Sequence, residues 1–324
     1  MKTTIIGAGI TGLYLAWKLA ERGEEVVVFE KKPKIGKQAC SGLFSERILE
    51  FIPESQKLIQ NQIGSVLIHF PKRTVKVEFS NPKGEQVPYG AGKFLVMSHF
   101  ELDNLVANLA ENSGAKIILN RNVSRRDLDI FRNGFDRIIG CDGPNSVIRQ
   151  NLGLPDPNYR LAIQGFVPKS DSSDFVETWP VQQGFIWKIP RGKEIEYGII
   201  AKPKEAKELF EDFLKKNNLQ LERIESAVVP QGFSISSNPK ITLCGDAAGL
   251  TKPWSGGGVV WGLLAAELFL KSFPDFIKYK NMMEKFFLPK ITISRIATKI
   301  VYFFGFNIPW ILPKSVKIEG DFLF

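Results

Sequence analysis

Residues 3–30 read TTIIGAGITGLYLAWKLAERGEEVVVFE, and this stretch decides the fold of the chain. A short apolar strand runs into a glycine turn over residues 7–12, and a helical pattern of apolar residues follows over 13–22. A second apolar strand over 25–29 then ends at Glu30. Strand, G-x-G-x-x-G turn, helix, strand and acid in this order predict a dinucleotide-binding unit.

Each glycine of the turn has a separate expected role. Gly7 permits the tight turn, Gly9 lets the backbone approach a pyrophosphate, and Gly12 lets the helix pack closely on the strand. The helix N-terminus then presents backbone N–H groups to the phosphates. Glu30, at the end of the second strand, is expected to accept hydrogen bonds from a ribose.

The composition is that of an ordinary globular protein. Of the 324 residues, 44% are hydrophobic and 24% are charged, which provides enough apolar side chains for a large core. Cys40, Cys141 and Cys244 lie far apart, and no signal-peptide pattern precedes the first strand. We therefore expect a cytoplasmic protein without a disulfide framework, and no metal site is predicted.

The net charge of +9 comes from 43 basic and 34 acidic residues. Nucleic acid, an anionic membrane surface and anionic small molecules are the partners that such a charge favours. Basic tracts with interleaved aromatic residues are missing from the sequence, so no nucleic-acid partner is expected. The other two partners remain open.

Two later stretches, residues 137–149 and 241–270, repeat the pattern of an apolar strand that runs into a glycine turn and a helix. Elsewhere, apolar and polar residues alternate over 65–79, which indicates antiparallel strands. A helix is expected over 44–51 and a turn over 81–84.

The sequence therefore predicts an α/β fold in which a Rossmann-like domain with a parallel sheet is interleaved with an antiparallel β-sheet substrate domain. A C-terminal helical segment follows. The dinucleotide-binding domain is expected over residues 1–55, 95–157 and 235–275, the antiparallel domain over 56–94 and 158–234, and the C-terminal segment over 276–324.

Three motifs in this order resemble those of the glutathione-reductase-type FAD fold, in its p-hydroxybenzoate-hydroxylase-like branch. They are GAGITG with Glu30, CDGPNSVIR at 141–149 and GDAAGLTKPWSGGG at 245–258. Two further stretches, ACSGLFSER at 39–47 and GFIWKIPRG at 184–192, resemble the cysteine loop and the aromatic-proline motif of archaeal-type geranylgeranyl reductases. That family uses FAD to saturate double bonds in prenyl chains, notably those of archaeal ether phospholipids.

The resemblance implies a set of residues that bind FAD. Glu30 should hold the adenosine ribose, Asp246 a ribityl hydroxyl, and Val123 should present backbone to the adenine. The glycines before the last predicted helix should let its N-terminus approach the pyrimidine end of the flavin. The full implied set is Gly7, Ala8, Gly9, Gly12, Glu30, Cys40, Gly42, His99, Val123, Asp142, Gly143, Asp246, Gly249, Gly256, Gly257, Gly258 and Val259.

The chain departs from the family pattern in two places. His99 stands where the family usually carries an arginine near the cofactor, and a histidine is mostly neutral at pH 7. The aromatic-proline motif, approximately Tyr-x-Trp-x-Phe-Pro-x-Gly, here begins with Phe185 and has Ile189 in place of its Phe. By the resemblance, Phe185, Trp187 and Pro190 bind substrate; packing of a sheet is the alternative.

Cys40 is the candidate catalytic residue, and a small buried side chain in a turn is the alternative for it. Cys141 and Cys244 each end an apolar strand, so both are expected to fill the core. His69 lies in a predicted strand with no partner suggested by the sequence. The sequence therefore identifies no proton donor.

The function implied is an FAD-dependent oxidoreductase that acts on a prenyl lipid. Its electron donor would be NAD(P)H or a ferredoxin, since no second nucleotide fingerprint occurs. A flavin-dependent monooxygenase or halogenase of the same fold is an alternative, because the halogenase motif Trp-x-Trp-x-Ile-Pro overlaps residues 185–190. A non-catalytic prenyl-binding escort like the GDI proteins is a third alternative, against which the three intact glycine motifs argue.

The C-terminal segment admits several roles. Residues 290–299 are basic and amphipathic, and residues 300–312 are uncharged and rich in aromatic side chains. The uncharged run is shorter than the roughly 20 residues that span a bilayer. It suits an interfacial helix, which would bind peripherally to the inner face of the cell membrane, a cap on an apolar pocket, or a helix packed in the core.

Overall fold

The computed structural model of the protein describes residues 1–37, 39–79 and 92–318. The chain forms two compact units, each built from three pieces of sequence. Unit 1 comprises Met1–Lys37, Phe100–Asn158 and Pro230–Ile291, and unit 2 comprises Gln38–His99, Tyr159–Val229 and Thr292–Phe324.

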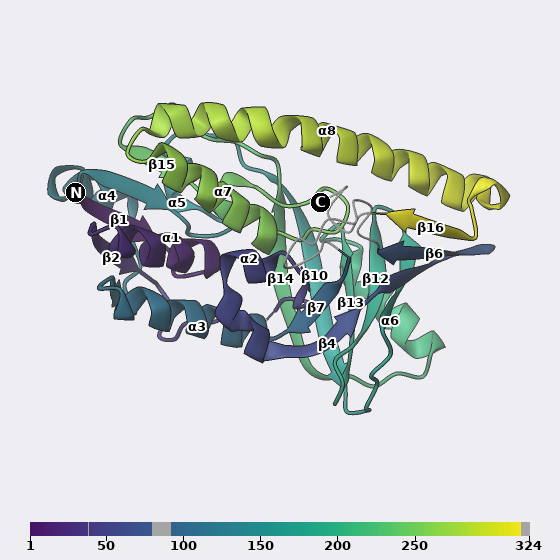
Figure 1. The fold of residues 1–324 in the computed structure, drawn as a ribbon. Coiled ribbons are helices and arrows are strands. Elements are labelled where there is room, and N and C mark those ends of the chain that lie inside the picture. Colours follow the sequence, from purple (N-terminus) through teal and green to yellow (C-terminus); the bar gives the residue numbers. More distant parts are fainter. Residues whose placement is uncertain (38, 80–91, 319–324) are drawn as a thin grey trace. The chain divides into compact units, whose positions relative to one another are not determined.

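A five-stranded parallel sheet forms the centre of unit 1 (Figure 1). Its order is β15-β9-β1-β2-β8, so the first strand of the chain lies in the middle. The strands are β1 (Lys2–Ile6), β2 (Glu25–Phe29), β8 (Lys116–Ile118), β9 (Arg137–Gly140) and β15 (Ile241–Leu243). The parallel sheet predicted from the three strand–glycine patterns is confirmed.

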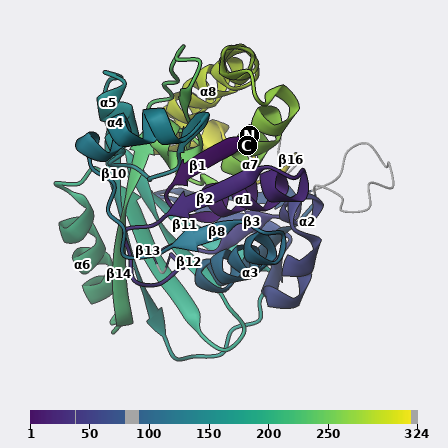
Figure 2. The ribbon, with the colours of Figure 1, turned by 90° about the vertical axis from the view of Figure 1, so that its left-hand side faces the viewer.

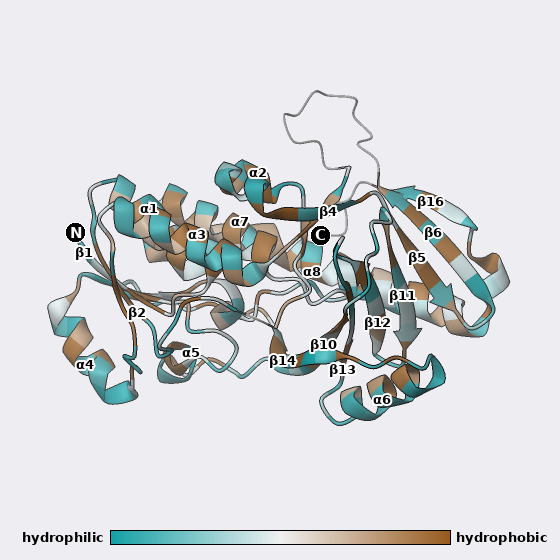
Figure 3. Cartoon of the chain, turned by 90° about the horizontal axis from the view of Figure 1, so that it is seen from below, coloured by the Kyte–Doolittle hydropathy of each residue, from teal (hydrophilic) through white to brown (hydrophobic). Residues whose placement is uncertain are grey.

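The helices of unit 1 pack on this sheet through apolar side chains. Helix α1 (Ile10–Glu21) is buried along almost its whole length, because Leu13, Leu15 and Leu19 face the core and its other side meets helix α7 (Val259–Ser272). The remaining helices are α3 (His99–Asn112), α4 (Arg125–Gly134), α5 (Val147–Asn151) and a 3₁₀ helix (Gly245–Ala248). Strand β2 is brown, and therefore apolar, along most of its length in Figure 3.

An eight-stranded sheet dominates unit 2, in the order β14-β10-β13-β12-β11-β5-β6-β16. Most described pairs are antiparallel, as predicted, whereas β11–β5 and β6–β16 are parallel. The strands are β5 (Ser65–Phe70), β6 (Arg73–Phe79), β10 (Asn158–Val167), β11 (Phe175–Val181), β12 (Gly184–Pro190), β13 (Ile195–Ala201), β14 (Glu222–Gln231) and β16 (Ser315–Ile318).

Helix α6 (Ala206–Lys216) lies beside strands β13 and β14 in Figure 2. Its Ala206 and Phe210 pack with Ile186 and Ile199 of the sheet in one apolar cluster. The opposite side of α6 is charged, which gives the alternation of brown and teal residues visible in Figure 3. Burial of one apolar stripe is the usual reason that such a helix docks on a sheet.

A small second sheet in unit 2 corrects one sequence prediction. The helix expected over 44–51 is in fact strand β3 (Leu43–Ser45) followed by the short helix α2 (Ile48–Phe51). Phe44 pairs with Leu95, and this tertiary strand pairing overrides the local helical pattern. The sheet also holds β4 (Ile59–Ile63) and β7 (Phe94–Met97), and a 3₁₀ helix covers Pro53–Leu58. The turn expected over 81–84 lies outside the described residues.

Helix α8 (Phe276–Asn307) is the longest helix of the described chain and contains Pro289. It belongs to unit 1 up to Ile291 and to unit 2 from Thr292 onward, and a 3₁₀ helix (Pro309–Ile311) follows it. Within the described ranges, no helix is both long enough and apolar enough to cross a membrane.

Candidate functional site

The glycines of the first turn in unit 1 differ in their surroundings: Gly7 and Gly12 pack against other backbone atoms, and Gly9 faces open space. A Cβ added to Gly7, whose φ is +104°, would lie 2.3 Å from the carbonyl oxygen of Cys141. A Cβ on Gly12 would lie 2.2 Å from the carbonyl oxygen of Gly7. A Cβ on Gly9 would meet no atom of the chain within 4 Å. The space beside Gly9 therefore fits the expected approach of a pyrophosphate.

Glu30 closes this turn. Its carboxylate is 9% exposed and accepts the backbone N–H of Ala8 at 2.8 Å and that of Lys32 at 2.9 Å. Each carboxylate oxygen has a second acceptor position, so Glu30 retains the capacity to accept a ribose hydroxyl. Val123, the residue implied at the adenine, is buried in the loop between β8 and α4.

The second glycine motif holds a carboxylate with one acceptor left over. Asp142 Oδ2 accepts the N–H groups of Val147 at 2.7 Å and Ile148 at 3.3 Å, and so caps helix α5. Its Oδ1 is buried and has no hydrogen-bond partner within the part of the chain that the structure describes. Burial raises the pKa of Asp142, and the hydrogen bonds to its carboxylate oppose that shift. An acceptor buried in this way beside Gly143 fits a ligand that donates a hydrogen bond.

Arg149 joins the second and third motifs, and the sequence analysis missed it. The side chain is 1% exposed and donates to the backbone oxygens of Pro144 at 3.3 Å, Asp246 at 3.2 Å and Ala247. It lies within the CDGPNSVIR stretch, but only the fold shows that its partners come from the third motif.

The third motif surrounds the N-terminus of helix α7. A Cβ on Gly258 would lie 2.8 Å from Asp246 Oδ1, so this carboxylate lies against the residue that precedes the helix. Lys37 Nζ lies 3.7 Å from Asp246 Oδ2. The sharp loop needs left-handed glycines at Gly249 (φ +67°) and Gly256 (φ +74°).

Thr11 brings the first and third motifs together. A Cβ on Gly245 would lie 2.8 Å from Thr11 Oγ1, and a Cβ on Gly262 would lie 2.5 Å from it. The three glycine motifs therefore follow the carboxyl ends of β1, β9 and β15, the edge where ligands bind in such sheets. All the implied cofactor residues except Cys40, Gly42 and His99 belong to unit 1.

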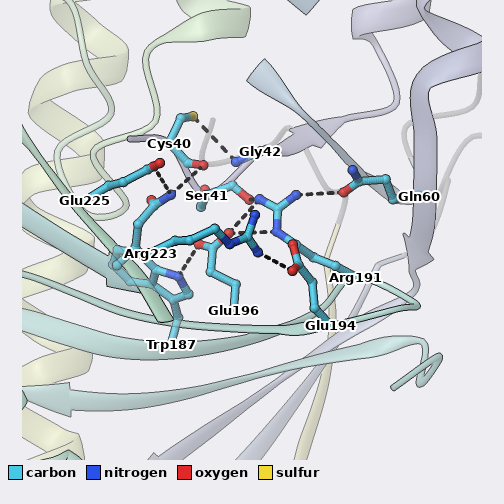
Figure 4. A network of polar contacts seen from close by, with 11 residues as sticks. Cys40, Ser41, Gly42, Gln60, Trp187, Arg191, Glu194, Glu196, Arg223 and Glu225 are labelled. Atoms are coloured by element: carbon cyan, nitrogen blue, oxygen red, sulfur yellow. Dashed lines mark hydrogen bonds and ion pairs between the residues drawn. The ribbon is translucent and has the colours of Figure 1, made fainter. Parts of the chain in front are cut away.

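The cysteine loop lies in unit 2, and the Arg191 side chain, just after strand β12, donates to its Ser41 carbonyl oxygen (Figure 4). Cys40 is half-buried, and its Sγ lies 3.5 Å from the Gly42 backbone nitrogen. Gln164 donates to the Cys40 carbonyl oxygen at 3.3 Å. Gly42 has φ +61°, and a Cβ there would lie 2.1 Å from the Met97 carbonyl oxygen.

His99 also belongs to unit 2 and is 5% exposed. Its ring packs edge-on against Phe44, with 5.8 Å between the ring centroids.

The aromatic-proline motif lies on strand β12 in the same unit. Trp187 is 6% exposed and belongs to a buried cluster with Val66 and Val96. Phe185 is half-buried, with its ring centroid 5.9 Å from that of Trp187, and Pro190 is buried. Packing accounts for Trp187 as a core residue; its role toward a substrate stays a prediction.

His69 has partners that the sequence did not indicate. Its Nε2 lies 3.0 Å from Glu177 Oε2, and its ring stacks on Trp179 with 5.1 Å between centroids. Lys188 bridges Glu177 and Asp171 in the same group. Glu177 and Trp179 are more than a hundred residues away in sequence, and no local pattern indicates that strands β5, β11 and β12 lie side by side.

Cys141 and Cys244 fill the core, as predicted. Cys244 is fully buried and Cys141 is 9% exposed. Burial raises the pKa of the Cys244 thiol to about 12 and that of the Cys141 thiol well above its ordinary value. Neither thiol has the exposure or low pKa of a reactive cysteine.

The parallel sheet, the three clustered glycine motifs and the separate sheet of unit 2 define the fold of FAD-dependent oxidoreductases. Residues 5–50 match the family of NAD(P)-binding Rossmann-like domains.

Among particular relatives, the chain is 24% identical to a digeranylgeranylglycerophospholipid reductase of Methanococcus vannielii, over 87% of this chain and 79% of that protein. The fold is similar to that of a geranylgeranyl bacteriochlorophyll reductase-like protein from Thermoplasma acidophilum, with a TM-score of 0.69, 20% identity and coverage of 88% and 83% of the two chains. The myxobacterial chondrochloren halogenase CndH shares the fold, with a TM-score of 0.67 and 14% identity over 94% of this chain and 82% of that one. The resemblance to geranylgeranyl reductases predicted from the motifs is confirmed.

Proposed function

We propose that this chain is an FAD-dependent reductase that saturates C=C bonds in the prenyl chains of isoprenoid lipids. The observation that carries the proposal is the gathering of three glycine motifs around Thr11, Asp246 and Arg149 in unit 1. The name of the archaeal relatives supplies the substrate class, a phospholipid with geranylgeranyl chains.

Residues of unit 1 would hold the cofactor. Glu30 would accept the ribose hydroxyls, the backbone at Gly9 would lie against the pyrophosphate, and Asp246 would accept a ribityl hydroxyl. The N-terminus of α7 after Gly258 would support the pyrimidine end, where its partial positive charge would stabilise negative charge. Bound FAD supplies the hydride for the alkene.

Residues of unit 2 would act on the substrate. Phe185, Trp187 and Pro190 offer apolar surface to a prenyl chain, and Cys40 acts at the reaction face. Support for these roles comes from the resemblance of residues 39–47 and 184–192 to the reductase motifs. NAD(P)H or a ferredoxin is the electron donor in this proposal.

The last part of α8 would contact the membrane that contains the substrate. Ile293, Ile296, Ile300 and Phe303 recur at helical spacing, and each is at least half exposed. The other side of the helix packs on unit 2, where the Tyr302 hydroxyl donates to the Gly184 carbonyl oxygen at 2.7 Å. We call Ile293, Ile296, Ile300, Phe303, Trp310 and Ile311 the apolar face; exposed Arg295, Lys299 and Lys314 lie near it in sequence.

The test is reduction of prenyl lipids without oxygen. The purified protein should be yellow, and after anaerobic photoreduction it should add mass in steps of two hydrogens to a geranylgeranyl phospholipid, as read by mass spectrometry. A colourless protein that still binds prenyl lipids would favour an escort. A yellow protein that modifies its substrate only when oxygen is present would favour the monooxygenase or halogenase alternative. The fold that this chain shares with the halogenase CndH is compatible with that alternative. Either result contradicts the proposal.

A further inference from the structure

A buried ion pair in unit 2 joins Arg191, which lies in the stretch 184–192 but is not among the predicted site residues, to Glu196 (Figure 4). Arg191 is 7% exposed and Glu196 is fully buried. Arg191 Nε lies 2.8 Å and its Nη2 2.5 Å from Glu196 Oε2. The two residues flank the turn between strands β12 and β13.

The remaining donors of Arg191 reach the cysteine loop and strand β4. Its Nη2 donates to the Ser41 carbonyl oxygen at 2.6 Å, and its Nη1 donates to Gln60 Oε1 at 2.8 Å. A Cβ on Gly42 would lie only 2.9 Å from Arg191 Nη2, so the guanidinium fits closely under the loop. The planar fork of an arginine matches several fixed acceptors at once, which a lysine does not.

The other end of the pair reaches the aromatic-proline motif. Glu196 Oε1 accepts the indole N–H of Trp187 at 2.8 Å. A continuous hydrogen-bonded path therefore runs from Trp187 through Glu196 and Arg191 to the carbonyl group of Ser41, beside Cys40 (Figure 4). The two stretches that resemble geranylgeranyl reductases are thus parts of one polar network.

Burial of two charges contributes little net stability, because the desolvation cost offsets the attraction between them. A fully hydrogen-bonded pair does fix geometry. We propose that Arg191 and Glu196 are positioning residues that hold the backbone at Cys40 and Ser41 in a fixed position relative to the Trp187 side chain. The inference rests on the proposed function only in that Cys40 is taken to act at the reaction face. The positioning role itself rests on the contacts described within unit 2.

The experiment measures the alkylation rate of Cys40 by iodoacetamide in the full-length protein, with peptide mass spectrometry to resolve each thiol. Cys141 and Cys244 serve as buried references. The double variant Arg191→Met, Glu196→Gln removes both charges, so no unpaired charge remains buried, and the amide oxygen introduced at position 196 still accepts the indole N–H of Trp187. We expect Cys40 to react at least fivefold faster in this variant, and circular dichroism checks that the variant is folded.

The matched control is Arg223→Met with Glu194→Gln. These residues form an ion pair of the same chemistry nearby, but at 58% and 30% side-chain exposure, and neither side chain is a hydrogen-bond partner of the cysteine loop in the described part of the chain. In this control variant, iodoacetamide should alkylate Cys40 at the same rate as in the parent. Equal rates in the parent and in a folded Arg191→Met, Glu196→Gln variant would overturn the proposal.

Arg191→Lys decides the matter if the double variant does not fold. One ammonium group cannot reach Glu196, Gln60 and Ser41 together, so a Cys40 rate above that of the parent supports the proposal and a parental rate overturns it. The readout requires neither flavin nor lipid. A protein without prenyl reductase activity that still shows this pattern would sink the proposed function and leave the positioning role standing.

Discussion

The contrast between Gly9 and Gly12 allows cofactor binding to be separated from folding at single residues. Gly9→Ala places its methyl group in open space and should leave the thermal midpoint of the FAD-free protein nearly unchanged. If the pyrophosphate binds beside Gly9 as proposed, that methyl would obstruct it, and FAD affinity should fall at least tenfold, about 1.4 kcal/mol. Titration of FAD against the apoprotein checks this.

Gly12→Ala is the control for that experiment. Its methyl would meet the Gly7 carbonyl oxygen, so it should lower the thermal midpoint even without FAD. If Gly9→Ala binds FAD like the parent, the turn does not hold a pyrophosphate.

Glu30 has a structural and a predicted binding role, and a conservative change separates them. Glu30→Gln keeps one acceptor oxygen for the turn that Glu30 closes at Ala8 but removes the charge. Hydrogen bonds to charged groups contribute about 1.5–3 kcal/mol, so FAD affinity should fall while the fold of the apoprotein persists. Equilibrium dialysis of FAD and circular dichroism of the apoprotein measure the two effects; normal FAD affinity would contradict the assignment.

Cys40 lies in a loop whose backbone carbonyl oxygens, at Cys40 and Ser41, accept hydrogen bonds from the side chains of Gln164 and Arg191. Cys40→Ala should therefore leave flavin content and thermal midpoint near those of the parent while it slows alkene reduction. Cys40→Ser keeps a polar group of similar size, so its rate of alkene reduction should lie between those of the parent and Cys40→Ala. If Cys40→Ala loses FAD or does not fold, Cys40 has a structural role. If its turnover is normal, Cys40 has no role in the reaction.

At the scale of elements, the exposed aromatic residues of helix α8 and the 3₁₀ helix after it allow membrane binding to be tested separately from folding. Phe303 is 56% exposed and Trp310 is 72% exposed, so their replacement by Ser should leave the fold intact. Each aromatic side chain buries a large apolar area when it enters a bilayer, so the Phe303→Ser, Trp310→Ser variant should bind liposomes at least tenfold more weakly. Vesicle sedimentation checks the result.

Ile130→Ser offers a matched control, because Ile130 is 68% exposed on helix α4 and lies outside the apolar face. It should bind liposomes as the parent does. Equal binding by the parent and the Phe303→Ser, Trp310→Ser variant would remove the apolar face from the membrane proposal.

At the scale of the whole molecule, the charge of +9 sets how membrane binding responds to salt. A basic residue near an anionic surface contributes about 1 kcal/mol, and the Debye length shortens from about 30 Å at 0.01 M salt to about 10 Å at 0.1 M. Binding to vesicles that contain anionic lipid should weaken as salt is raised, and binding to zwitterionic vesicles should be weaker throughout. Salt-independent binding would mean that the apolar contact acts alone.

The sequence predicted those features that local patterns encode. The parallel sheet, the three glycine motifs and the burial of Cys141 and Cys244 all follow from strand periodicity and glycine spacing. It missed what depends on long-range contacts: Arg149 on the backbone of the third motif, His69 beside Glu177, and strand β3 in place of a helix. No local pattern reports a partner that a distant strand supplies.

The order of the strands in unit 1 has a consequence during protein synthesis. Strand β1 is made first and lies at the centre of the sheet, yet its neighbour β9 begins only at Arg137 and the outer strand β15 only at Ile241. At roughly 5–20 residues per second, one edge of β1 waits on the order of ten seconds on the ribosome for its partner, and the sheet waits longer for completion. An unpaired apolar edge invites aggregation over such a delay. Nascent chains stalled before residue 241 should therefore associate with chaperones, and expression should improve when translation is faster or holdase capacity is greater.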